Sequence, residues 1–201
     1  VDPVRVECRL AAGEVSCPSC PDGKLAGWGF ARCRPVVGMA EPVRPRRSRC
    51  RSCLVTHVLL PVTLLLRRAY LADLIWAALV AKAAGAGHRA IGARFGVPVG
   101  TVRGWLRVIG GRAEVVRNWF VAIAVAAGVD VSIPKATRSR CADVAAAVGA
   151  ATAALAARFG DGSVVGGVTA PAVAVACSGA RLLSPGWPAV PGPGRCNTNC
   201  P

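Results

Sequence analysis

The chain has 201 residues, 53% of them hydrophobic, and a formal net charge of +15 from 25 Lys and Arg against 10 Asp and Glu. This length fits one ordinary domain or two small ones. The basic excess is nearly all Arg, which favours a polyanionic partner because guanidinium groups bind phosphates and base edges through paired hydrogen bonds. High genomic GC content, which raises Arg, Ala, Gly and Pro together, is the alternative explanation of the charge.

Neither secretion nor membrane insertion is expected. Charges are scattered through residues 1–17, which hold no apolar run of signal-peptide length. The apolar run Leu54–Leu66 is only 13 residues long and contains Pro61, and the uncharged window Gly162–Ala180 carries Pro171 and several glycines. Neither resembles a membrane span of roughly 20 residues. We therefore expect a cytoplasmic, nucleoid-associated protein without a membrane partner.

The first 62 residues predict a short lead-in followed by a small β module. Residues 1–14 are expected to be flexible. Residues 15–62 are rich in Cys, Arg and turn residues. Between the turns lie three short β-compatible runs, at Leu25–Arg32, Val43–Cys50 and Leu54–Leu60.

Two Cys-x-x-Cys pairs within this module predict a metal site. Cys17 and Cys20 form the first pair, Cys50 and Cys53 the second, with 29 residues between the pairs. Each pair sets two thiolates on one side of a tight turn, and two such turns complete a closed four-sulfur Zn²⁺ site with a structural role. Chance pairing or redox thiols are the alternatives. The other candidates are expected to be strand or core residues (Cys33, His57), lone thiols (Cys8, Cys141, Cys177) or a weak pair in the tail (Cys196, Cys200).

A run of arginines leads into the second cysteine pair. The segment PVRPRRSRCRSC, residues 42–53, contains five of them. Alternate residues of a strand share a face, so Arg47, Arg49 and Arg51 are expected to project together and to follow a phosphate backbone. A solvated, charged edge strand that discourages aggregation is the alternative.

From Tyr70 onward the apolar residues recur at helical spacing. Helices are expected over 70–82, His88–Phe95, Gly100–Ile109 and Arg112–Ala127, all within a homeodomain-like helix-turn-helix domain at 63–128. An Ala-rich helical region at 129–160 contains a fifth helix, Ala142–Phe159, and residues 161–201 are expected to form an irregular, low-complexity Gly/Pro tail. The predicted fold is thus mainly α with a small N-terminal β zinc ribbon.

The stretch HRAIGARFGVPVGTVRGWLR, residues 88–107, is typical of a helix-turn-helix. Gly96 permits positive φ in the turn, and Gly92 is small enough for the helices to touch. Pro98 fits before the next helix begins hydrogen bonding. The shared core is expected to consist of six apolar residues: Ile91, Phe95, Val97, Val102, Trp105 and Leu106.

The outward face of the later helix is the expected DNA-contacting surface. Arg103 is the candidate for a bidentate guanine contact, Thr101 for a base-edge or phosphate hydrogen bond, and Arg107 for a phosphate. Gly100 on this face and two basic residues of the preceding helix, Arg89 and Arg94, complete the candidate set. Replacement of Arg103 is expected to weaken sequence preference more than replacement of Arg68. A plain three-helix bundle with solvated arginines is the alternative.

Four segments carry a resemblance to a known family: CPSC, WGFxR, RRSRCRSCLVTHVLLP and HRAIGARFGVPVGTVRGWL. Together they cover about residues 15–125 and resemble a high-GC bacterial family of unknown function that pairs a transposase-type zinc ribbon with a homeodomain-like helix-turn-helix. The closing GARLLSPGWP is also similar to the family's end. The resemblance implies a mobile-element-related DNA-binding protein and names no activity.

The sequence therefore predicts a transposase-type protein that binds double-stranded DNA and has no catalytic domain of its own. A nuclease of the RNase H-like kind needs three carboxylates on hydrophobic strands. The carboxylates after Trp105 lack such strands: Glu114, Asp130, Asp143 and Asp161. A homodimer or a separate transposase is the expected protein partner. The alternative is a transcriptional regulator or protein-interaction module that dimerises through the helix at 142–159.

Overall fold

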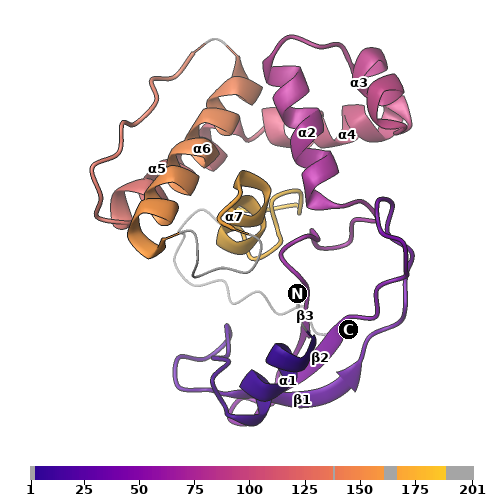
Figure 1. Cartoon of the computed structure of the whole chain (residues 1–201), viewed down its shortest axis with the longest axis vertical. Helices are drawn as coiled ribbons and strands as arrows, with labels where there is room; N and C mark the ends of the chain where they lie inside the picture. The colour runs from indigo at the N-terminus through magenta and orange to yellow at the C-terminus, as the bar shows by residue number, and fades with distance from the viewer. Residues whose placement is uncertain (1–2, 138, 161–166, 189–201) are drawn as a thin grey trace.

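A computed structural model describes residues 3–137, 139–160 and 167–188, which form a small sheet module at one end of the molecule and a helical body at the other (Figure 1). The sheet module contains β1 (Leu25–Phe30), β2 (Arg46–Cys50), β3 (Thr56–Leu59) and a leading helix, α1 (Pro3–Ala11). The body contains α2 (Ala72–Ala83), α3 (His88–Phe95), α4 (Val99–Gly110), α5 (Ala113–Ala126), α6 (Arg140–Phe159) and α7 (Ala170–Cys177). The predicted combination of a mainly helical chain with a small N-terminal sheet is confirmed.

The sheet is antiparallel with the strand order β1-β2-β3. Leu25 pairs with Cys50, and Arg47 of β2 pairs with Val58 of β3. The register shifts between Gly27 and Phe30, where Gly29 has a φ of +80°. Before this irregularity the strand alternates regularly, so Trp28 shares the face of Ala26, whose partner is Arg49.

The prediction of a flexible lead-in is wrong for residues 3–11, because α1 packs on the sheet. Leu10 is buried in a cluster with Cys17, Leu25 and Cys50. The guanidinium of Arg46 donates hydrogen bonds to both carboxylate oxygens of Glu7, at 2.6 and 3.0 Å. Helix α1 is only nine residues long, a length at which a helix depends on tertiary contacts such as these.

One hydrophobic core runs through the whole helical body, from Leu65 to Trp187. Helices α2 to α5 occupy the predicted segments within two residues at each end. Phe120 of α5 is the largest fully buried side chain among the described residues. Leu79 of α2, Ile91 of α3 and Ile109 of α4 are also fully buried. The body therefore has a common interior in place of the three regions that we expected after residue 62.

Helix α6 belongs to this core. Its buried stripe consists of small residues that pack on α5 and α2: Val144, Ala147, Val148, Ala151 and Ala154. Among the described helices it alone is long and apolar enough to cross a membrane by length and composition. Its buried face is used inside the chain, while Ala146, Gly149, Ala153 and Ala157 are exposed, and dimerisation through this helix stays a prediction.

The prediction of an irregular tail is wrong for residues 167–188. Helix α7 follows Thr169, whose side chain accepts a hydrogen bond from the N–H of Ala172. Residues 180–188, which we call the C-terminal clasp, then close the core with three buried side chains: Leu182, Leu183 and Trp187. Residues 189–201, with Cys196 and Cys200, lie outside the described part of the chain.

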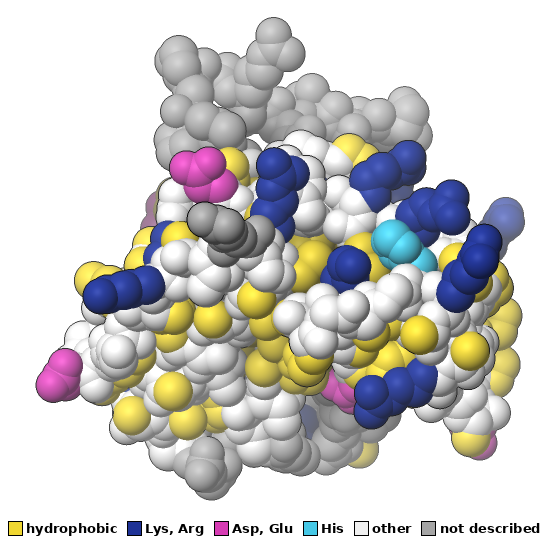
Figure 2. Space-filling view, turned by 90° about the horizontal axis from the view of Figure 1, so that it is seen from above, with side chains coloured by type: hydrophobic (Ala, Val, Ile, Leu, Met, Phe, Trp, Pro, Cys, Tyr) yellow, Lys and Arg dark blue, Asp and Glu magenta, His cyan; other side chains and the backbone are white. Residues whose placement is uncertain are grey.

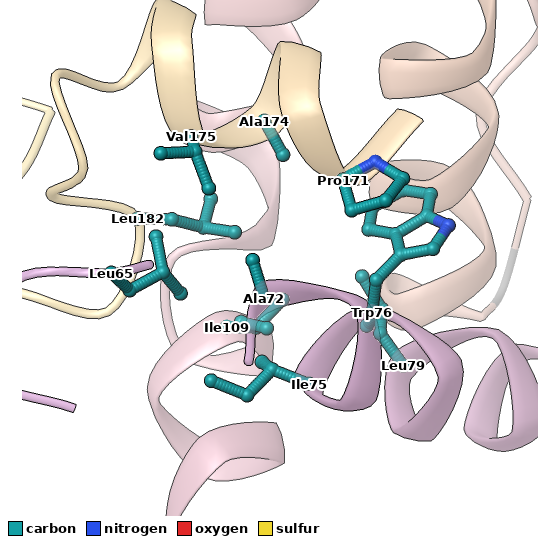
Figure 3. A pocket seen from close by; sticks show the side chains of 10 residues that line it. All are labelled: Leu65, Ala72, Ile75, Trp76, Leu79, Ile109, Pro171, Ala174, Val175 and Leu182. Atoms are coloured by element: carbon teal, nitrogen blue, oxygen red, sulfur yellow. The ribbon is translucent and has the colours of Figure 1, made fainter. Parts of the chain in front are cut away.

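The clasp and α7 cover α2. Figure 3 shows Pro171, Ala174 and Val175 of α7, with Leu182, facing Ile75, Trp76 and Leu79 of α2 around a small cavity. Every side chain that lines this cavity is apolar. Apart from the indole N–H of Trp76, it therefore offers no polar side-chain group that could orient a ligand.

Candidate metal centre and candidate nucleic-acid surfaces

The four predicted cysteine ligands lie together at the base of the sheet module. The sulfurs of Cys17, Cys20, Cys50 and Cys53 are all within 4.8 Å of one another. Cys50 ends β2, the turn after β2 supplies Cys53, and the loop before β1 supplies the other two. Four sulfurs at this spacing can bind a metal ion, and the described residues show no other group of three or more such ligands.

Backbone groups hold the sulfurs in place. The N–H of Ser19 points at Cys17 Sγ at 3.3 Å, and the N–H groups of Ser52 and Cys53 point at Cys50 Sγ at 3.4 and 3.5 Å. Gly23 is buried beside the cluster, and a Cβ there would lie 2.6 Å from Cys50 Sγ and closer still to Cys20 Sγ. The turn that contains Cys17 and Cys20 therefore requires glycine at position 23.

The electrostatics of the cluster favour a cation. The backbone N–H of Cys53 lowers the pKa of Cys50 to about 6, so this thiol ionises near neutral pH. Burial and the neighbouring thiols raise the pKa of Cys20 to about 12. Several thiolates this close repel one another, and a divalent ion at their centre would remove that repulsion.

His57, which the sequence predicts to be a strand or core residue, is a neighbour of the cluster. It lies half-buried in β3, and its Nε2 is 3.5 Å from Cys17 Sγ. Burial lowers the pKa of His57, so the imidazole is neutral and can donate an N–H to a ligating sulfur. Cys33 is exposed in the loop after β1 and is not among the four clustered cysteines.

The second candidate site is the glycine-hinged helix pair, α3 and α4 joined by residues 96–98. Gly96 ends α3 in the left-handed region with φ of +64°. A Cβ on Gly92 would lie 2.8 Å from the carbonyl oxygen of Val97, so only glycine allows this close approach. Five of the six predicted core residues are buried, and Phe95 is half-buried beside them.

The arginines of this helix pair point to solvent. Arg103 and Arg107 are exposed on α4 together with Gly100, while Thr101 is half-buried. Arg89 and Arg94 are exposed on α3, and the Arg94 guanidinium lies 5.1 Å from the ring of Phe95. Seen from above, this side of the molecule carries a gathering of Lys and Arg side chains (Figure 2).

The ribbon arginines only partly form the expected row. Arg47 and Arg49 alternate with buried Ser48 and Cys50, so they share the face of β2 opposite the cysteines. Arg51 is exposed but lies in the turn beyond β2. Figure 1 places β2 and the helix pair at opposite ends of the molecule, so the two sets of arginines do not form one continuous surface.

Two basic residues counted only as charge have structural contacts. Arg112 donates hydrogen bonds to the carbonyl oxygens of Ser184, at 2.7 Å, and of Trp187. Arg68 donates to the carbonyl oxygen of Leu183 at 2.7 Å. Both fasten the C-terminal clasp, and Arg68 is therefore unsuitable as the neutral surface comparison for Arg103.

The acidic residues after Trp105 do not converge on one site. Asp143 accepts hydrogen bonds from the backbone N–H and the hydroxyl of Thr137, both at 2.7 Å. Glu114 lies in the first turn of α5, Asp130 in the loop after it, and Asp161 outside the described residues. None of the described three lies on a strand.

Comparisons of the chain with protein-family models, with curated proteins and with solved structures found no match. The resemblance to a transposase-like family therefore stays a prediction.

Proposed function

We propose that this protein binds double-stranded DNA through the glycine-hinged helix pair, with the cysteine cluster holding a structural Zn²⁺ ion. In this proposal the pair acts as a helix-turn-helix, and α4 enters the major groove. The protein acts in the context of a mobile element, as its resemblance implies, without carrying out strand cleavage itself.

The exposed basic stripe of α4 is the observation that carries this proposal. Residues 88–110 contain no Asp or Glu, so no acidic side chain of the pair neutralises the four exposed arginines. Arg103 and Arg107 are one helical turn apart and share a face with Gly100. A guanidinium at the position of Arg103 has the reach and geometry for the O6 and N7 atoms of guanine.

The four cysteines support the zinc assignment. Four thiolates without a fifth ligand position suit tetrahedral Zn²⁺ in a closed, structural site. Cys50 belongs to both the cluster and β2, and Cys17 packs against α1 through Leu10. The ion would thereby connect the sheet to α1.

A duplex selected from a random-sequence pool provides the test, with binding of the zinc-loaded full chain measured over a salt series. Affinity should fall steeply with salt, because each neutralised phosphate releases counterions. Arg103→Ala should weaken binding to the selected duplex by roughly 5- to 100-fold and relax its sequence preference. Arg181→Ala is the matched control, since Arg181 is exposed outside the pair. Equal losses in the two variants would reduce the interaction to nonspecific charge attraction.

A protein-interaction module is the second candidate, and three exposed apolar residues on α5 favour it. Val115, Trp119 and Val125 are 43, 40 and 64% exposed. Light scattering of the full chain and of Val125→Asp tests this candidate: a dimer that the substitution dissociates would support it, and a monomer in both cases would exclude self-association through α5.

A further inference from the structure

A second basic surface lies on the sheet module, at the opposite end from the helix pair. We call it the outer sheet face and define it by Trp28, Arg47, Arg49, Thr56 and Val58. Arg47 pairs with Val58 and Arg49 with Thr56, so these four side chains share one face of β2 and β3. The buried face beneath them holds Ser48 and Cys50.

Trp28 is the distinctive feature of this face. It is 52% exposed, although tryptophan is mostly buried in folded proteins. The guanidinium of Arg49 lies 4.8 Å from the ring, and the Nε of Arg49 also donates to the carbonyl oxygen of Leu54 at 3.1 Å. Arg49 therefore covers part of the indole, while about half of Trp28 stays exposed to solvent.

Two further arginines lie next to this region in the chain, Arg47 on the same face of β2 and Arg51 in the turn after it. Arg47 and Arg51 are exposed on either side of Arg49 in the chain, and neither makes an ion pair within the described residues. The acidic residue nearest to β2, Glu7, is bound to Arg46 on the other face. The outer sheet face thus combines an aromatic platform with uncompensated positive charge.

We propose that the outer sheet face binds single-stranded nucleic acid, with an unpaired base stacked on Trp28 and the adjoining phosphates contacting Arg47 and Arg51. A base fits the open side of an indole whose other side is covered by a guanidinium, and stacking of this kind accepts any base. A paired base inside a duplex presents only its edges and cannot stack on the ring. This site goes beyond the proposed function, which concerns duplex DNA and the helix pair.

The test measures binding of the zinc-loaded full chain to a fluorescent oligothymidylate and to an abasic strand of the same length. Wild-type protein should bind the oligothymidylate more tightly, and Trp28→Leu should weaken that binding by roughly 5- to 100-fold while leaving the abasic strand unchanged. Trp28→Phe should restore most of the affinity. The matched control is Phe159→Leu, because Phe159 is 57% exposed beside Arg158 yet lies on the helical body.

Three results would overturn the proposal. Equal binding of both strands by wild-type protein would assign the attraction to phosphates alone. An unchanged affinity in Trp28→Leu, with zinc content and circular dichroism as in wild type, would remove the indole from the site. Displacement of the oligothymidylate by polyglutamate as readily as by unlabelled strand would assign the face to acidic protein segments. Arg103→Ala tests the duplex site separately and should leave binding of oligothymidylate unchanged.

Discussion

Replacing Arg112 with Met tests how strongly the C-terminal clasp is fastened to the helical body. The guanidinium donates its best hydrogen bonds to the carbonyl oxygens of Ser184 and Trp187, and a longer one of 3.4 Å to that of Leu182. Methionine keeps the apolar stem but has no donor, so the variant isolates the loss of these hydrogen bonds.

The expected loss follows from the number and kind of these bonds. A hydrogen bond from a charged donor contributes roughly 1.5–3 kcal/mol, so the two best bonds together contribute about 3–6 kcal/mol. Burial lowers the pKa of Arg112, which shows that removing this charge from water offsets part of that gain. We expect Arg112→Met to lower the free energy of unfolding by about 2–4 kcal/mol.

Urea unfolding followed by circular dichroism and by tryptophan emission measures this change. The emission should respond because Trp187 lies in the clasp, with its ring 5.7 Å from that of Trp119. Arg181→Met is the matched control, an exposed arginine within the clasp itself, and should be nearly neutral. A loss below about 0.5 kcal/mol in Arg112→Met, or an equal loss in the control, would refute the assigned role.

Three further predictions concern the helix pair and the cysteines. Gly92→Ala should lower the free energy of unfolding by about 1–3 kcal/mol, because its Cβ would meet the carbonyl oxygen of Val97. Gly104→Ala has nothing near its Cβ and should raise the free energy of unfolding by about 0.5–1 kcal/mol. Urea unfolding compares the two variants, and a change of the same sign in both would contradict the close approach at Gly92. Acidification should release the proposed Zn²⁺, since protons compete with the metal for thiolates. A zinc-sensitive dye would record this release, and an ion that stays bound in strong acid would contradict thiolate ligation. Site-resolved alkylation at neutral pH should modify exposed Cys8 faster than Cys141, because burial raises the pKa of the Cys141 thiol and lowers its thiolate fraction; equal rates would mean that α6 opens readily.

The features predicted well from sequence have local causes. Gly92 and Gly96 define the turn between α3 and α4 through backbone geometry, and the structure places the ends of α3 at the predicted residues. Each cysteine pair is a short-range motif, and the antiparallel pairing of β1 with β2 brings the two pairs together. Apolar periodicity located α2, α4 and α5 for the same reason.

The features that sequence reasoning missed depend on partners far away in the chain. Arg112 looks like any surface arginine until residues 182–187 supply their carbonyl oxygens, which lie about 70 positions later. Helix α1 is short, and contacts with Arg46 and with the sheet stabilise it. Trp28 would have been assigned to the interior by hydrophobicity alone, but it lies on the exposed face of β1 beside Arg49.

The clasp sets an order on synthesis of the protein by the ribosome. All four clustered cysteines precede the helical body in the chain, so the sheet module can bind the proposed Zn²⁺ while translation continues. The helical body folds later, since Leu182, Leu183 and Trp187 are needed to close it. Until then apolar side chains of α2 are exposed to solvent, and a nascent chain at that stage is the form most in need of a chaperone.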